Sequence, residues 1–206
     1  MQKKSNVCSF EIFYLYKLII TLLLVITSNL STATALADFN TGLDAYQKGD
    51  FKTALGEWLP DAEKGDPHAQ HMLGFLYANG RGVELKPELT VHWWRQAASQ
   101  GFAPAQYTLG SLYRKGLGVP YNSKKAATWI ERAADAGYPK AQYDIGIMYA
   151  NGEGVTQDLG TAYMWLDQAA RARGADPERY RETLDKHLNG AQRIEEDTLK
   201  KGWYRK

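Results

Sequence analysis

The feature that most constrains this chain is an internal repeat of 36 residues, which recurs three times without a gap from Pro67, Ala103 and Pro139. Alanine followed by glutamine opens each copy, and glycine and tyrosine return at fixed later positions. A period of this length is typical of helical-repeat proteins, in which each copy buries its apolar surface only against neighbouring copies. Stacked copies are therefore expected to share one core.

Each copy has the spacing of two helices. The first segment places apolar residues at offsets that form one stripe of an α-helix, as in Ala69, Leu73 and Tyr77. Paired glycines such as Gly80 and Gly82 are expected to end this helix. The second helix restarts near Lys86-Pro87, Asn122-Ser123 and Asp158, and the last two sites offer a side-chain N-cap. The sequence predicts an all-α fold of antiparallel helix pairs, and the first helix of each pair is called helix A.

Two residue types recur inside these helices where they must serve packing. A glycine inside a helix costs about 1 kcal/mol relative to alanine, so its return at Gly74, Gly110 and Gly146 predicts a place where a neighbouring backbone comes close. Tryptophan returns at equivalent apolar positions of the second helix, which predicts a core role rather than a ligand box. These tryptophans are Trp93, Trp129 and Trp165.

Weaker similarity extends the repeats on both sides. A shortened first copy, with a tight turn at Gly49-Asp50-Phe51, is followed by the three full copies and then by two predicted helices that cap the array. The predicted divisions are a degenerate repeat at 38–66, repeats at 67–102, 103–138 and 139–174, and C-terminal capping helices at 175–206.

Residues 1–37 have the pattern of an export signal. Lysines precede the apolar run 18–26, and Ala35-Leu36-Ala37 supplies the small residues that a signal peptidase accepts, so cleavage is predicted after Ala37. An uncleaved membrane anchor is the alternative, although the run is about half of the roughly 20 apolar residues that a spanning helix needs. The expected location is the periplasm or the medium, with no membrane span in the mature chain.

The mature chain is electrically balanced. The leader holds three lysines and one glutamate of the 25 basic and 23 acidic residues, so 22 of each remain. A nucleic-acid partner is not expected, because such proteins usually carry a basic patch or stripe. The single cysteine, Cys8, lies in the leader, so the mature chain can form no disulfide.

The repeat closely resembles the Sel1-like repeat family, which is related to the tetratricopeptide repeats. The motif is Ala-Gln-x-x-Leu-Gly-x-x-Tyr-x-x-Gly-x-Gly-Val followed by Trp-x-x-x-Ala-Ala, and it covers residues 67–174 strongly and 38–66 weakly. The resemblance implies a right-handed α-solenoid whose A helices line a concave surface, and an adaptor role in signalling, envelope or secretion processes. A cysteine-rich branch of the family is linked to β-lactams, but it pairs cysteines that this mature chain lacks.

Neither an active site nor a metal site is predicted. The Gly-x-Gly loops follow helix ends, whereas a nucleotide-binding loop follows a strand and precedes a helix, so chain reversal is the favoured role. His68 and His71 have a spacing that could present two imidazoles to a metal ion, but no third ligand is evident. We therefore expect no catalytic residues, no cofactor and no enzymatic activity.

The candidate binding surface lies on helix A opposite the core stripe, and we call it the helix A face. It is too apolar for plain solvent surface, and such patches usually mark binding sites. The alternative is that Tyr107 and Tyr143 fill grooves between repeats. The helix A face consists of His71, Phe75, Tyr107, Ser111, Arg114, Tyr143 and Ile147.

Three functions remain in competition. The favoured hypothesis is an exported scaffold that binds a protein or peptide on the helix A face. The second is a binder or enzyme acting on a cell-wall-related ligand, such as a β-lactam. The third is a structural subunit of an envelope assembly that docks through residues 193–206.

Overall fold

The computed structural model describes residues 39–172, and over this range the chain consists of helices and loops without a strand. The all-α solenoid predicted from the sequence is confirmed. The predicted leader, residues 1–37, and the predicted capping helices, residues 175–206, lie outside the described residues. No helix in the described range is both long and apolar enough to cross a bilayer.

The chain divides into two compact units, Met1–Trp58 and Leu59–Lys206. Helical backbone at residues 39–47 leads through a turn at Gly49, with φ of 81°, into α2 (Phe51–Glu63), whose residues 59–63 belong to the second unit. The Asp50 carboxylate accepts a hydrogen bond from the Thr53 amide at 3.1 Å and so caps α2. The Trp58 indole donates to the Phe39 carbonyl at 3.1 Å and packs directly on Gly42.

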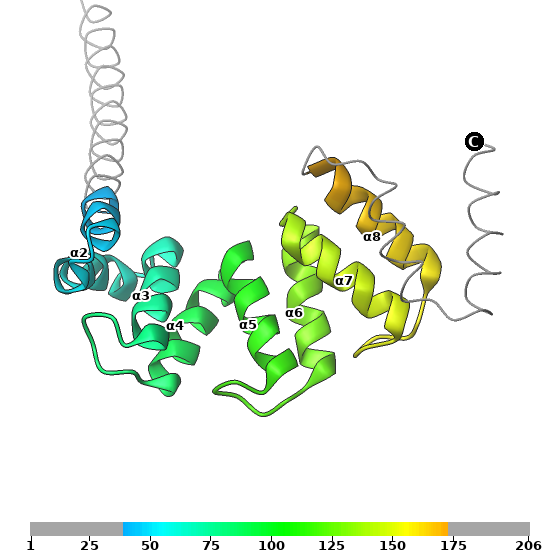
Figure 1. The fold of residues 1–206 in the computed structure, drawn as a ribbon, viewed down its shortest axis with the longest axis horizontal. Helices are drawn as coiled ribbons and strands as arrows, with labels where there is room; N and C mark the ends of the chain where they lie inside the picture. Colours follow the sequence, from blue (N-terminus) through cyan, green and yellow to red (C-terminus); the bar gives the residue numbers. More distant parts are fainter. Residues whose placement is uncertain (1–38, 173–206) are drawn as a thin grey trace, which may run out of the picture. The chain divides into compact units, whose positions relative to one another are not determined.

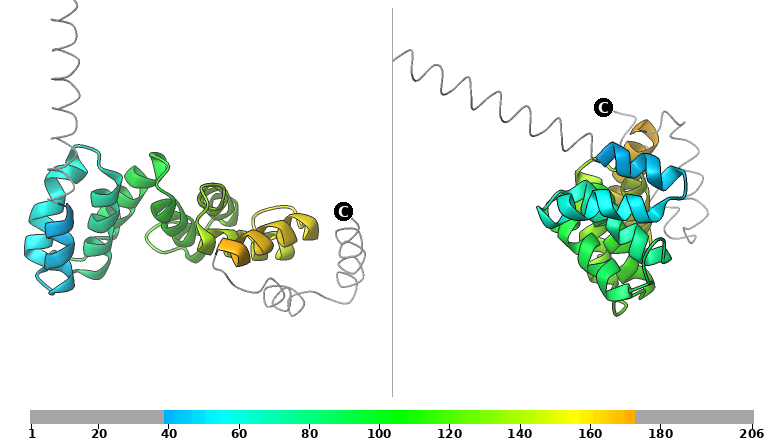
Figure 2. Two further views of the ribbon diagram at one scale, coloured as in Figure 1. Left: turned by 90° about the horizontal axis from the view of Figure 1, so that it is seen from above. Right: turned by 90° about the vertical axis from the view of Figure 1, so that its left-hand side faces the viewer.

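The second unit contains three helix pairs in chain order. The two helices of each pair pack against each other, and the second helix of one pair packs against the first helix of the next. Figures 1 and 2 show this succession from cyan to gold. The pairs are α3 (Pro67–Asn79) with α4 (Pro87–Ser99), α5 (Ala103–Lys115) with α6 (Ser123–Asp135), and α7 (Pro139–Asn151) with α8 (Leu159–Ala172).

The predicted helix ends are confirmed. Helices α3, α5 and α7 each end at a left-handed glycine with φ between 61° and 68°, where a side chain would be strained. The Asn122 side chain accepts from the Lys125 amide at 2.9 Å, and Asp158 accepts from the Thr161 amide at 3.2 Å. A third cap, Asp66 on the Ala69 amide at 2.7 Å, was not predicted.

The recurring helix A glycines are packing positions, as predicted, but the closest neighbour is a side chain of the paired helix rather than its backbone. A Cβ added at Gly110 would lie 2.6 Å from Ile130 Cγ1 and 3.0 Å from the Ala126 carbonyl oxygen. Trp94 and Leu166 occupy the equivalent places opposite Gly74 and Gly146. These glycines therefore allow a large apolar residue to press onto the helix A backbone.

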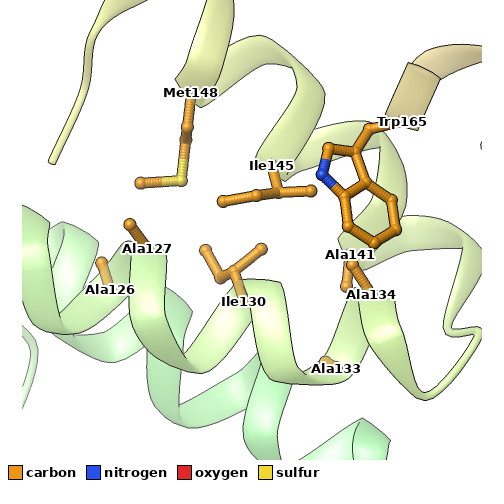
Figure 3. Close-up of a cluster of buried hydrophobic side chains, with 9 residues drawn as sticks. All are labelled: Ala126, Ala127, Ile130, Ala133, Ala134, Ala141, Ile145, Met148 and Trp165. Carbon is orange, nitrogen blue, oxygen red and sulfur yellow. The ribbon is translucent and has the colours of Figure 1, made fainter. Parts of the chain in front are cut away.

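Small residues bring the helices close together around these large ones. Figure 3 shows Ile130, Ile145, Met148 and Trp165 packed among alanines of α6 and α7. The core prediction holds for Trp165, whereas its two counterparts lie at the margin of the core, with Trp129 packed against the buried cluster of Ala97, Ala98, Ala105 and Leu109. Trp93 and Trp129 are only half-buried, and the Arg132 guanidinium lies over the Trp129 ring at 4.8 Å from its centroid. The buried indole of the first full repeat is Trp94.

Candidate functional site

The structure places the seven predicted residues of the helix A face on α3, α5 and α7, the first helices of the three pairs. All seven are half-buried rather than exposed. They do not form one uniform patch, because the side chains of successive helices meet different neighbours. The first junction, between the α3–α4 and α5–α6 pairs, is aromatic, whereas the second, between the α5–α6 and α7–α8 pairs, is polar.

At the first junction, His71 and Phe75 belong to an aromatic cluster. The His71 ring lies 4.8 Å from that of Phe75 and 5.3 Å from that of Phe102, and Phe75 lies 5.3 Å from Trp94. Burial, with a smaller contribution from the neighbouring His68, lowers the pKa of His71 from 6.5 to about 4. His71 is therefore neutral at neutral pH and acts as one more aromatic ring.

At the second junction, Tyr107 links α5 to α7. Its hydroxyl donates to Asp144 Oδ2 at 2.7 Å, and its ring lies 5.4 Å from that of Tyr138. The Lys140 ammonium lies 5.2 Å from the Tyr107 ring centroid. Burial, followed by the hydrogen bond to Asp144, raises the pKa of Tyr107 above its ordinary value. The phenol is therefore neutral and serves as a hydrogen-bond donor.

A second polar link lies beside the first. Arg114 Nε and Nη2 donate to the two carboxylate oxygens of Glu153 at 2.8 and 2.6 Å, which is the bidentate geometry of a strong charge-assisted pair. Glu153 raises the pKa of Arg114. The Ser111 hydroxyl donates to the Tyr107 carbonyl of its own helix at 2.9 Å, and Ser111 also interacts with the Tyr107 side chain. This part of the helix A face thus has a fixed charge pattern.

The remaining two predicted residues belong to the last described pair. Tyr143 and Ile147 pack against the buried cluster of Ala150, Leu159, Ala162 and Leu166 within that pair. The proposal that tyrosines fill grooves between repeats therefore describes Tyr107, which crosses a junction. Among the described residues, Tyr143 packs against its own helix pair.

Asp144 and Glu153 complete the polar junction, and sequence reasoning missed both. Their equivalents in the preceding repeat are Thr108 and Leu117, so no repeated acidic residue marked the positions. Their acidic character is specific to the third full copy, and the partner residues become evident only when α5 and α7 are placed side by side.

The repeated glutamine has a structural role that its recurrence could have indicated. Gln70, Gln106 and Gln142 are buried, and each side-chain nitrogen donates to a carbonyl in the last turn of the preceding helix. The acceptors are the carbonyls of Ala62 at 3.0 Å, Ala98 at 3.2 Å and Ala134 at 3.3 Å. A polar residue that returns inside an apolar stripe is the available signal for such a link.

The histidines weighed as metal ligands instead share an aromatic neighbour. His68 packs on Phe102 with ring centroids 4.6 Å apart, and His71 contacts the same ring. Over residues 39–172 the structure contains no group of three or more histidine, cysteine, aspartate or glutamate side chains that could hold a metal ion.

Comparison with known proteins gives three Sel1 repeat matches, at residues 67–102, 103–138 and 139–173. A solved structure of a Sel1 repeat protein from Oxalobacter formigenes is 33% identical, with a TM-score of 0.63, over 65% of this chain and 55% of that one. The second, c5321, is described as a protective antigen of uropathogenic Escherichia coli with an SLR fold. It is 31% identical, with a TM-score of 0.63, over 72% of this chain and 33% of its own length.

This chain thus spans about half of the first solved relative and a third of the second. None of the curated proteins compared with it matches significantly.

Proposed function

Because this chain belongs to the Sel1 repeat family, whose members generally mediate protein–protein interactions, we propose that it is an exported scaffold that binds a protein or peptide on its helix A face. The observation that carries the proposal is the preformed pattern on α3, α5 and α7. An aromatic region around Phe75 is followed by charges of both signs at Arg114 and Asp144.

Such a pattern can recognise an extended partner by shape and charge. Aromatic side chains held in place give contact area at a low cost in conformational entropy. The paired charges define where partner residues of each sign would fit. The face predicted to be concave would therefore select a segment with an apolar end and a polar end.

Two observations support export. The leader pattern of residues 1–37 is that of a secretory signal. The similar E. coli protein is described as a protective antigen, which fits a protein displayed outside the cytoplasm. Fractionation of the host cell, with N-terminal sequencing of the purified protein, tests this, and a mature N-terminus at Asp38 is expected. A protein that keeps Met1 and stays with the membrane would instead establish the anchor.

We propose a binding role without catalysis, since Sel1 repeat proteins are typically non-catalytic scaffolds. Tyr107 and Arg114 on the helix A face are engaged by Asp144 and Glu153 of the next repeat, which suits recognition better than proton transfer. Turnover of a chromogenic β-lactam is the quickest check, and none is expected.

Ser111 offers the sharpest test of the binding face. It lies centrally on α5 and bonds only to its own helix, so Ser111→Lys adds bulk to the face without removing a link between repeats. Thr128 makes the same kind of bond to Lys124 on α6, which makes Thr128→Lys a matched control.

The experiment is capture of envelope proteins by the purified protein and both variants, after circular dichroism has shown that all three are folded. We expect the wild type and Thr128→Lys to retain the same partner and Ser111→Lys to lose it. Equal capture by Ser111→Lys would remove the helix A face from consideration.

A further inference from the structure

The most exposed large apolar side chains in the described part of the chain lie away from the helix A face. They are Leu85, Leu117 and Tyr121, with 57%, 55% and 63% of their surface accessible. All three lie in the loops that join α3 to α4 and α5 to α6. Exposure of this extent means that packing does not require their size.

Both loops meet the start of α4, since the α3–α4 loop leads directly into it and the α5–α6 loop packs on it. A Cβ added at Gly118 would lie 3.2 Å from Val91 Cγ2 and 3.7 Å from Pro87 Cβ, so the α5–α6 loop rests on the start of α4. Leu117 directly precedes Gly118, and Leu85 lies two residues before Pro87. Figure 1 shows both loops at the lower edge of the α3–α6 region. We call Leu85, Leu117 and Tyr121 the loop-edge patch.

The backbone of this patch is held in place. The Leu117 amide donates to the Leu112 carbonyl at 3.1 Å, and the Asn122 amide donates to the Tyr113 carbonyl at 2.9 Å. The Gly116 amide also bonds to Leu112. The loop therefore presents Leu117 and Tyr121 from a preformed turn, which reduces the entropy that a partner must overcome.

The sequence around Leu117 and Tyr121 is basic, whereas Leu85 lies between Glu84 and Lys86. No aspartate or glutamate occurs between Glu88 and Glu131. Lys115 lies two residues before Leu117, and Lys124 lies three residues after Tyr121. Within residues 39–172 neither lysine takes part in an ion pair, whereas Lys86 on the neighbouring loop pairs with Glu84 at 3.3 Å. Two unneutralised cations thus flank the apolar side chains.

The third full repeat lacks this arrangement. Glu153 and Gln157 occupy the positions of Leu117 and Tyr121, and both are engaged, Glu153 with Arg114 and Gln157 with the Ala150 carbonyl. Exposed apolar residues at these loop positions thus occur only in the first two full repeats, so the loop conformation does not require them.

We propose that the loop-edge patch is a second docking site, for an acidic segment of a partner protein that carries apolar side chains. Binding would remove the exposed apolar surface of Leu117 and Tyr121 from water, and the acidic residues would meet Lys115 and Lys124. A membrane surface is disfavoured, because recognition of anionic lipid takes clusters of about 4–8 basic residues.

The test is selection of a random-peptide phage library on the purified protein. We expect the recovered peptides to combine Asp or Glu with large apolar residues. A synthetic copy of one such peptide should bind the Leu117→Asn/Tyr121→Asn double variant at least about tenfold more weakly, a loss of about 1.4 kcal/mol. Both side chains are mostly exposed, so the variant should keep the wild-type melting temperature.

Charge variants examine the second half of the proposal. The Lys115→Glu/Lys124→Glu double variant should bind the same peptide more weakly, and its binding should depend less on salt. Lys52→Glu, on the exposed surface of α2, should change neither. Ser111→Lys should bind the peptide with the affinity of the wild type. A failure of the proposed binding on the helix A face can therefore be told apart from a failure of binding at the loop-edge patch.

Three outcomes would overturn the proposal. In the first the library yields no binding peptide, and in the second its peptides bind the double variant as well as the wild type. The third is binding to vesicles of phosphatidylcholine and phosphatidylglycerol that the double variant loses, which would assign the patch to a membrane.

Discussion

Three buried glutamines connect each helix pair to the one before it. Each amide nitrogen reaches a carbonyl in the last turn of the preceding helix, in a place that is almost closed to water. The side-chain nitrogen is therefore essential to the link, because an oxygen in its place would lie against the carbonyl oxygen and repel it.

Gln106→Glu makes that change without altering shape. We expect it to lower the free energy of unfolding by about 2–4 kcal/mol at neutral pH, since a buried carboxylate would lack a donor. Urea denaturation measures the loss, and part of it should return in acid as the carboxyl protonates. Gln168→Glu, on the exposed surface of α8, is the control and should cost little. Equal effects would show that the Ala98 link is unimportant.

His71 makes stability depend on pH. Its pKa is about 4 in the fold and 6.5 when exposed, so its contribution is complete above pH 6.5 and is lost as pH falls towards 4. The shift corresponds to at most about 3 kcal/mol. Tyr107 and Tyr143 occupy the equivalent positions of the next two repeats, and the Phe39 carbonyl accepts from Trp58 as the His71 carbonyl accepts from Trp94, so His71→Phe should fold and lose less stability over this range. Parallel pH profiles in chemical denaturation would contradict this.

At the scale of the helix, the interior glycines reverse the usual propensity rule. Alanine is the better helix former by about 1 kcal/mol. At Gly110, however, the added methyl would collide with Ile130 and with the Ala126 carbonyl. Helix pairing therefore outweighs local preference at this position.

Gly110→Ala should destabilise the protein by about 1–3 kcal/mol, because α5 and α6 must move apart. Gly56 in α2 is the matched control, since a Cβ there meets nothing within 4 Å. Gly56→Ala should instead stabilise by up to about 1 kcal/mol. Thermal denaturation of both variants decides the matter, and a stabilised Gly110→Ala would refute the packing argument.

The sequence alone predicts the helices well and the contacts less well. The repeat period and the helix caps locate the helix pairs. Asn122, Asp158 and the left-handed glycines begin or end a helix through contacts with residues close to them in the chain, so the sequence reveals them. The repeat spacing marked Trp93 as a core position, but the neighbouring Trp94 is the more deeply buried of the two, because adjacent positions on a helix face different neighbours. Of the candidate site, Tyr107 and Arg114 were identified, but their partners lie about one repeat away along the chain and only the fold brings them together.

Across the three full repeats, the two junctions differ in chemistry. The first relies on aromatic packing around Phe102, and the second relies on Tyr107–Asp144 and Arg114–Glu153. The stability of the two junctions should depend differently on salt concentration, because salt weakens ion pairs and leaves apolar contacts largely intact.

A double-mutant cycle on Arg114→Ala and Glu153→Ala should give a coupling free energy of about 1 kcal/mol at low salt, since both side chains are partly exposed. The coupling should fall in high salt. A cycle on His71→Ala and Phe102→Ala should show no such fall. A salt-independent Arg114–Glu153 coupling would show that the pair acts through packing.

The glutamine link also bears on how such a gene could change length. Donor and acceptor stand eight residues apart in all three copies, at Ala62 and Gln70, Ala98 and Gln106, and Ala134 and Gln142. Loss of residues 103–138 would bring Gln142 to the same spacing from Ala98, and duplication of that stretch would create another complete link. Unequal recombination could therefore add or remove a unit while its junction remained intact, and selection would act on the surface presented by each unit.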